Sequence, residues 1–438
     1  MRRRTVVLLV LGALTVTAGG AVIAARPLLE TGTGYAAHNA CAVAFVAERP
    51  ATSAADDLPP NPLVPLLRTS VDAAERSAGS SVLGLFRQTA WHTEGLGCTL
   101  GAERPTLEAP PEVAPDDWPE QALDERVDAA VDRAFGQPGG EPLGTRAVVV
   151  LADGRLVAER YADGFDADTR QLGWSMAKSV TSAMVGRLVT EGDLELGDDD
   201  LLPTWRDDQR RDIAVEDLLR MSSGLTWDEA YGLGTPVTEM LYASADMGAY
   251  AASQPLVEAP GTVQQYSSGT TNALCDVLQR RTGLGTGLAH ELVLGPIGMS
   301  SAVLEPDAAG GLVCSSYLWA TPRDWARFGQ WWLQGGEWQG RQLLDPSFVR
   351  WSTTPVELAG EDEGHAAHWW VNRRPDGSVR DDVLPADAFW AAGHDGQRVV
   401  VVPSAGVVVV RLGFDPALEG DQLGVEQLVA DVVEALGR

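Results

Sequence analysis

The sequence contains almost no lysine. Lys178 is the only lysine among 33 basic residues, so arginine supplies the rest of the positive charge. The chain also has no basic stripe, because 61 acidic residues bring its formal net charge to −28. Proteins that bind nucleic acid neutralise phosphates with clustered lysine and arginine. The composition therefore argues against a nucleic-acid partner.

The amino-terminal 30 residues have the pattern of a targeting segment. Arg2, Arg3 and Arg4 precede an uncharged apolar run from Thr5 to Ala25. A helix of about 20 apolar residues spans a bilayer. Residues 1–30 are therefore predicted to be a signal peptide or an N-terminal membrane anchor, and the poor cleavage site favours the anchor. Either alternative predicts an exported protein, secreted or anchored facing outside, that touches the membrane only through this segment.

Cysteine is scarce too, and no C-x-x-C pair occurs, so neither a structural zinc cluster nor a thioredoxin-type site is expected. An exported protein forms disulfides, and four cysteines allow three pairings. Pairing within each region would join Cys41 to Cys98 and Cys275 to Cys314. We expect this arrangement, although the spacing alone does not decide between the three.

The chain divides into two regions. Residues 31–122 are predicted to be a small leading module that ends in an acidic, proline-rich linker at residues 107–121. Residues 123–438 form the main domain. Two β-rich runs, Arg146–Leu151 and Arg155–Tyr161, flank an Asp-Gly turn signal and predict a hairpin.

A second hairpin is predicted near the end of the chain, where Arg398–Val402 and Val407–Leu412 flank a turn. An amphipathic helix at residues 422–436 follows. Between the hairpins, helical periodicity dominates. We therefore predict an α+β fold in which both ends of the domain build an antiparallel sheet flanked by helices, with a largely helical inserted subdomain at about residues 195–385.

Ser175 and Lys178 lie three residues apart at the start of a predicted helix that ends near Gly192. Residues i and i+3 share a helix face, so the hydroxyl and the amine can meet. A serine hydroxyl becomes a nucleophile when a neighbouring base takes its proton, and a lysine serves as base when burial lowers its pKa. Arginine cannot replace it, because its guanidinium stays protonated. The only lysine therefore stands where its neutral form is useful, which predicts acyl transfer.

Several further stretches form a known pattern with this pair. Together with Ser175–Lys178 they are Asp217–Leu225, Pro260–Gly269, Cys314–Tyr317, Arg323–Gly329, Ala392–Gln397 and, in the leading module, Gly34–Cys41. With these stretches the chain resembles the penicillin-binding, class C β-lactamase-like serine hydrolases, and in particular the branch that contains 6-aminohexanoate-dimer hydrolase and related esterases and amidases. The resemblance runs from about Arg146 to the C-terminus and implies a β-lactamase/transpeptidase-like fold.

The resemblance implies a mechanism in which Ser175 attacks a carbonyl and forms a covalent acyl-enzyme. Lys178 and Tyr266 would transfer the protons, and two backbone amides would hold the oxyanion. Tyr266 opens the family's second motif, Y-x-N, but here Ser268 stands in place of the asparagine. Serine keeps a hydrogen-bonding group and shortens its reach, which puts the family's contact to the substrate amide in doubt.

The third motif departs further from the family. Enzymes that hydrolyse β-lactams carry K-T-G there, and this chain has no lysine to supply. The segment aligns either at Gly393, which gives the second oxyanion amide to His394, or at Gly396, which gives it to Gln397; the first is favoured. Arg398 would restore some affinity for anions. The missing lysine argues against an efficient β-lactamase and leaves amide or ester hydrolysis open.

The predicted substrate is a small-molecule amide, ester or peptide, and neither a cofactor nor a catalytic metal is expected. Three alternatives remain: a non-catalytic, penicillin-binding-like surface sensor, a DD-peptidase or weak β-lactamase, and an α/β-hydrolase that uses His394. His365 and His368 beside an acidic run at residues 361–363 suggest a metal only weakly, because H-x-x-H lacks the helical HExxH spacing. By family analogy the pocket is lined by Tyr231, Ser315, Ser316 and Trp370.

Overall fold

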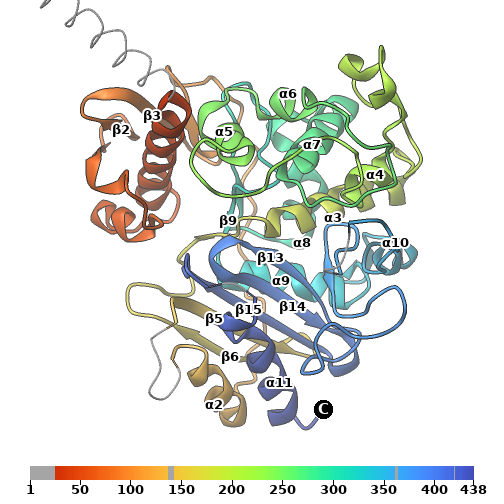
Figure 1. Ribbon diagram of the computed structural model, residues 1–438. Helices are drawn as coiled ribbons and strands as arrows, with labels where there is room; N and C mark the ends of the chain where they lie inside the picture. Colours follow the sequence, from red (N-terminus) through yellow and green to blue (C-terminus); the bar gives the residue numbers. More distant parts are fainter. Residues whose placement is uncertain (1–24, 137–142, 361–363, 419) are drawn as a thin grey trace, which may run out of the picture.

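The computed structural model describes residues 25–136, 143–360, 364–418 and 420–438. Nearly all of the apolar run that predicts a signal peptide or anchor lies outside these ranges. Within them, no helix is both long and apolar enough to cross a bilayer. Figure 1 shows the leading module beside the main domain.

The main domain is built on a six-stranded antiparallel sheet with the strand order β12-β13-β14-β15-β5-β6. Both predicted hairpins belong to it, so the two ends of the domain meet in one sheet, as expected. All sheets among the described residues are antiparallel, whereas an α/β-hydrolase requires a parallel one, so that alternative is wrong. The strands are β5 (Thr145–Ala152), β6 (Arg155–Tyr161), β12 (Trp370–Val371), β13 (Phe389–Gly393), β14 (Gln397–Val402) and β15 (Val407–Gly413).

Helices cover both faces of this sheet (Figure 1). The helices α2 (Glu125–Arg133) and α11 (Val425–Ala435) cover one face, while α3 (Met176–Glu191) and α9 (Pro322–Leu333) cover the other. Successive strand residues point to opposite faces, so a strand that is buried on both faces needs apolar residues throughout. This is why the central strands read as unbroken valine runs, with Val148 and Val149 in separate hydrophobic clusters.

A group of short helices lies beside the sheet, above it in Figure 1. It occupies much of the predicted helical subdomain, but α9, which covers the sheet, and β12, its edge strand, also fall in residues 195–385. The main helices here are α4 (Val215–Leu219), α5 (Pro236–Ala243), α6 (Met247–Ala252), α7 (Ser268–Thr282) and α8 (Gly295–Ile297), while α10 (Pro346–Ser352) lies to the right of the sheet in Figure 1. A three-stranded sheet joins β7 (Gln171–Leu172), β9 (Leu318–Ala320) and β8 (Val303–Leu304), and β10 (Glu337–Trp338) pairs with β11 (Arg341–Gln342).

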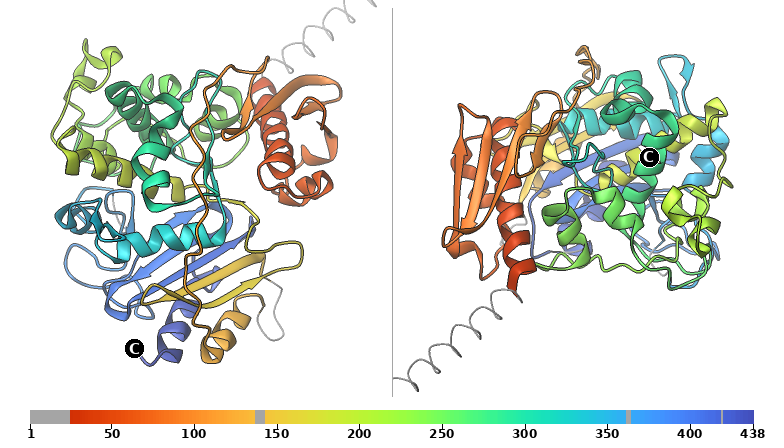
Figure 2. Two further views of the ribbon diagram at one scale, coloured as in Figure 1. Left: turned by 180° about the vertical axis from the view of Figure 1, so that it is seen from behind. Right: turned by 90° about the horizontal axis from the view of Figure 1, so that it is seen from above.

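The leading module packs a helix over residues 25–45 against a four-stranded antiparallel sheet. The expected disulfides are both present: Cys41 with Cys98 joins that helix to β4, and Cys275 with Cys314 joins α7 to the segment before β9. Seen from behind in Figure 2, the acidic linker runs from this module along the main domain to α2. The strands are β1 (Leu67–Asp72), β2 (Ser77–Val82), β3 (Leu85–Thr93) and β4 (Gly97–Leu100).

Candidate active site

Ser175 stands at a sharp turn between β7 and α3, where it is the residue before the first helical position. The turn depends on two neighbours. Gly173 is required because a Cβ there would come within 2.2 Å of the Trp325 ring. Trp174 adopts a positive φ of 50°, a conformation that a bulky residue takes only when its surroundings impose it. The tight turn presents Ser175 at the amino end of α3, where the helix dipole favours developing negative charge.

Lys178 lies one turn into α3, with only 2% of its surface exposed. Its Nζ has three oxygen partners: Ser175 Oγ at 2.9 Å, Ser268 Oγ at 2.9 Å and the backbone oxygen of Ser315 at 3.0 Å. The amine also lies 4.9 Å from the centre of the Tyr266 ring. The i, i+3 spacing therefore brings the lysine to the serine, as predicted.

Burial lowers the pKa of Lys178 to about 8, and the nearby Glu229 carboxylate opposes that shift. Two histidines also adjoin the lysine. Burial holds the pKa of His365 near 3 and that of His368 well below its usual range, so both rings are neutral. A lysine with a pKa near 8 is partly neutral at physiological pH and can accept a proton.

Tyr266 lies directly before Ser267, the N-cap residue of α7. Its half-buried ring stacks on Trp370 with the ring centroids 5.5 Å apart. Burial, followed by the negative charge of Glu229, raises the pKa of Tyr266 well above its ordinary value, while the Ser175 hydroxyl acts in the opposite direction. Tyr266 is therefore a neutral phenol close to Ser175.

Glu229 is a site residue that the sequence did not reveal. Its Oε1 accepts from the Ser268 hydroxyl at 2.5 Å, and its Oε2 accepts from the Ser268 amide at 2.8 Å and from Trp227 Nε1 at 2.6 Å. It lies in an irregular loop before α5 that carries no motif. The available signal was indirect: Glu229 stands two residues before Tyr231, which the family resemblance does identify.

Tyr231 reaches the site from the same loop. Its ring stacks on His394 with centroids 4.4 Å apart, and both rings make edge contacts with Trp174. Burial, and then the charge of Glu229, raises the pKa of the Tyr231 phenol above its ordinary range. An aromatic wall thus connects the turn before Ser175 to the third motif.

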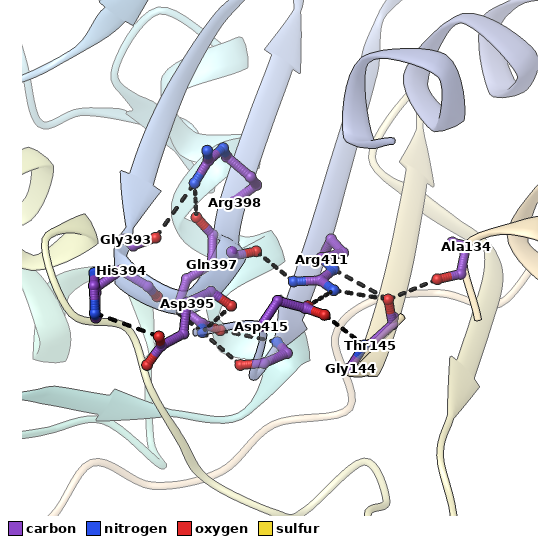
Figure 3. A network of polar contacts seen from close by, with 12 residues as sticks. Ala134, Gly144, Thr145, Gly393, His394, Asp395, Gln397, Arg398, Arg411 and Asp415 are labelled. Carbon is purple, nitrogen blue, oxygen red and sulfur yellow. Dashed lines mark hydrogen bonds and ion pairs between the residues drawn. The ribbon is translucent and has the colours of Figure 1, made fainter. Parts of the chain in front are cut away.

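The third motif is a tight loop between β13 and β14. Gly393 ends β13, and a Cβ there would come within 2.1 Å of the backbone oxygen of Gly173, so this strand end lies directly against the turn that carries Ser175. His394 begins the loop, with its Nε2 3.4 Å from Asp395. Figure 3 shows His394 and Asp395 side by side at the edge of this network. Gly393 and His394 are therefore placed beside the nucleophile.

Gln397 and Gly396, at the other end of this loop, are bound to β15. The side-chain Nε2 of Gln397 donates to the backbone oxygens of His394 at 3.1 Å and Gly413 at 2.6 Å, while the side-chain Oε1 accepts from the Gly413 backbone amide at 3.0 Å. The Gly396 oxygen accepts from Arg411 at 2.9 Å. These contacts fasten the loop to β15, as Figure 3 shows.

Arg398 is engaged with the backbone of the same loop. Its guanidinium donates to the backbone oxygens of Gln397 at 2.9 Å and Gly393 at 3.3 Å, and burial lowers its pKa to about 10. It stands across from Ala392 on β13 and beside Val400, in the face of the sheet that α2 and α11 cover. Whether Arg398 attracts substrate anions stays a prediction.

The remaining predicted residues surround the same centre. Ser315 and Ser316 are fully buried, with their hydroxyls 2.9 Å apart, and the Cys275–Cys314 disulfide fixes their segment to α7. Trp370 and Tyr266 line a cavity of about 530 Å³ that extends along residues 221–226. Ser175 is not in its lining, so the cavity adjoins the nucleophile through these two rings.

The weak metal alternative gains no support from the described residues. His368 Nε2 lies 3.3 Å from Thr271 Oγ1, and its Nδ1 lies 3.1 Å from the Lys178 backbone oxygen. His368 therefore packs against α3, while the His365 ring makes edge contacts with Tyr266 and Trp370. The acidic residues 361–363 lie outside the described residues, within which no group of three or more His, Cys, Asp or Glu side chains could hold a metal ion.

Comparisons with known proteins bear on the family and the fold. A family model described as Beta-lactamase matches residues 131–432. The 6-aminohexanoate-dimer hydrolase of Paenarthrobacter ureafaciens is 25% identical over 298 residues, which cover 62% of this chain and 73% of that protein.

Two solved structures show the same fold. A Bacillus anthracis protein assigned as a 6-aminohexanoate-dimer hydrolase is 24% identical, with a TM-score of 0.60 over 76% of this chain and 91% of its own. A family VIII carboxylesterase is 18% identical, with a TM-score of 0.56 over 72% of this chain and 99% of its own. At this level of identity, the structural likeness supports the fold and leaves the substrate open.

Proposed function

The chain belongs to the β-lactamase family, as a serine hydrolase, and from that premise we propose that it cleaves an amide or an ester through a covalent acyl-enzyme on Ser175. The observation that carries the proposal is the 2.9 Å approach of Lys178 Nζ to Ser175 Oγ in a buried setting. A nucleophile within hydrogen-bonding reach of a partly neutral base is the arrangement that acyl transfer needs.

In the proposed reaction, neutral Lys178 takes the hydroxyl proton of Ser175 as Oγ forms a bond to the substrate carbonyl carbon. The backbone amides of Ser175 and His394 would hold the resulting oxyanion, since Gly393 lies against the turn that carries the nucleophile. The tetrahedral intermediate then expels the leaving group, which takes a proton from the Tyr266 phenol. Tyr266 regains its proton from Lys178. Water attacks the acyl-enzyme and releases the acid by the reverse proton path.

The substrate class follows from what the site lacks and what its relatives cleave. The absent third-motif lysine removes the usual cation for a β-lactam carboxylate. Two of the similar proteins are named as a 6-aminohexanoate-dimer hydrolase and as a family VIII carboxylesterase. We therefore infer a linear amide or ester as substrate, and treat a DD-peptidase or a weak β-lactamase as the alternative that a substrate panel separates.

The test is turnover of p-nitrophenyl acetate and butyrate, 6-aminohexanoate dimer and nitrocefin by the wild-type protein, with Ser175→Ala as control. A fluorophosphonate should label Ser175 in the wild-type protein and leave the variant unlabelled. Ester or linear-amide turnover that Ser175→Ala abolishes is the expected result. Neither adduct nor turnover would instead favour a non-catalytic surface sensor.

We also propose that the protein is exported. The two disulfides fit an oxidising compartment, and the arginine-flanked apolar run at the amino terminus fits a targeting segment. Cell fractionation with antibody detection tests this. Protein found only in the cytosolic fraction, with its cysteines reduced, would contradict it.

A further inference from the structure

The partners of Lys178 determine which way its lone pair points. A neutral amine has two N–H donors and one lone pair, and three oxygens surround this one. The backbone oxygen of Ser315 only accepts, so it takes one N–H. The remaining N–H and the lone pair are then divided between two serine hydroxyls, Ser175 and Ser268. Only one of the two divisions leaves a base aimed at the nucleophile.

Glu229 decides between them. Three donors converge on its two oxygens, which suits the ionised, acceptor-only form of the carboxylate. The Ser268 hydroxyl donates to Oε1, so the proton of Ser268 is committed to Glu229 and its oxygen can only accept from Lys178. The second N–H of Lys178 is thereby used, and its lone pair is left facing the Ser175 hydroxyl.

We propose that Glu229 is a positioning residue that, through Ser268, fixes the direction of the hydrogen bonds around Lys178 and aims its lone pair at Ser175. This inference rests on the proposed hydrolase function and deepens it. It also explains how serine serves at the second motif where the family has asparagine. Ser268 and Glu229 together present an oriented acceptor to the lysine.

The Glu229→Gln variant should reverse the arrangement with little change in shape. The position of Oε2 faces two N–H donors, from the Ser268 backbone and Trp227, so the glutamine oxygen must occupy it. The glutamine NH₂ then faces Ser268 Oγ and donates to it. The Ser268 hydroxyl turns to Lys178 and consumes its lone pair.

The experiment measures kcat/KM for a p-nitrophenyl ester against pH. Glu229→Gln should lower the plateau about 100-fold, the usual contribution of a general base. Its acidic limb should move to lower pH, because the carboxylate that raises the pKa of Lys178 is gone. Asp228→Asn, which removes the same charge from the exposed neighbouring residue, should leave the profile unchanged. Matching thermal unfolding curves would show that both variants fold.

A double-mutant cycle with Ser268→Ala isolates the direction of the hydrogen bond. Without the Ser268 hydroxyl, nothing can turn to consume the lone pair, so Glu229→Gln should cost less than about threefold in the Ser268→Ala background. The inference would be overturned if Glu229→Gln lowered kcat/KM equally in the wild-type and Ser268→Ala backgrounds, or if its plateau stayed within threefold of wild type. In either case, turnover by the wild-type protein would still uphold the proposed function. If the wild-type protein turns over no ester or amide, the function and this inference fall together.

Discussion

At the scale of single residues, the burial of Lys178 sets its chemistry more than any one contact does. Removal from water lowers the pKa of Lys178 to about 8, against 10.5 for the free side chain. The Lys178 amine donates hydrogen bonds whether it is protonated or neutral, but only the neutral form can take the Ser175 proton. The reaction should therefore depend on pH in the range where the lysine loses its charge.

We expect kcat/KM for a neutral ester to rise about tenfold per pH unit at low pH and to level off above a pKa near 8. The sign follows from the base: raising the pH increases the neutral fraction of Lys178 until it is complete. Stopped-flow acylation between pH 5.5 and 10 measures the curve. A rate that falls as the pH rises through 8 would show that protonated Lys178 is the active form.

Lys178→Arg keeps the positive charge and removes the base, because a guanidinium stays protonated at every working pH. We predict the loss of more than about 10²-fold in acylation rate, with the fold retained. Fluorophosphonate labelling and circular dichroism measure the two effects separately. An arginine variant that acylates at a near-native rate would mean that another group accepts the proton.

Single residues also mark the limit of what the sequence could predict here. Ser175 and Lys178 were found because a helix places i and i+3 on one face, and Tyr266 because a motif accompanies it. Glu229 was missed because its loop has no periodicity, and its role depends on a hydrogen bond to Ser268, 39 residues away. Contacts made by irregular loops are set by packing, which spacing in the sequence does not encode.

At the scale of elements, the site depends on how closely β13 approaches the start of α3. Both hairpins of the sheet were predictable, because in each of them two β-rich runs flank a turn signal. The order of the strands and the close contact between β13 and the start of α3 could not be predicted, because both arise only when segments far apart in the sequence pack together. Two glycines, Gly173 and Gly393, are where the two elements meet.

Gly393→Ala tests this contact. The new Cβ would come within 2.1 Å of the Gly173 oxygen, a backbone atom that moves only with the whole turn. We expect β13 to shift away from Ser175, with a loss of about 1–3 kcal/mol in the free energy of unfolding and a larger loss in kcat than in KM. Urea unfolding and steady-state kinetics measure the two quantities.

Gly197→Ala is the matched control, because an added Cβ there meets no atom within 4 Å. It should leave both stability and turnover close to wild type. If Gly393→Ala behaves like this control, then the third motif does not need its close contact with the turn, and the oxyanion amide must be sought elsewhere.

At the scale of the whole molecule, Glu305 is one of the buried groups that join the leading module to the main domain. Glu305 is fully buried, and its oxygens accept from His38 at 2.8 Å, from the Cys98 amide at 2.6 Å and from Trp319 at 3.0 Å. Two of these donors belong to the leading module. The buried Glu305 carboxylate therefore has its full set of hydrogen-bond donors only while the leading module is docked.

The docked module in turn supports the site. Tyr35, on the helix over residues 25–45, stacks on Tyr242 with centroids 4.8 Å apart and makes an edge contact with Trp174, the residue before the nucleophile. Thr31 of the same helix accepts from the Gly234 amide at 3.1 Å, in the loop that carries Glu229. Undocking the module would thus remove support from two walls of the site.

Glu305→Ala should therefore lower stability and activity together. The change leaves three buried donors without an acceptor, so we expect a loss of about 3 kcal/mol in the free energy of unfolding. Glu94→Gln, at an exposed acid of the same module, should change it by less than about 0.5 kcal/mol. Urea unfolding followed by intrinsic fluorescence and by ester turnover reports on both properties. If the module detached in a separate transition while turnover stayed at the wild-type level, the main domain would hold the site without it. Coincident transitions would instead mean that the geometry around Ser175 is a property of the whole chain.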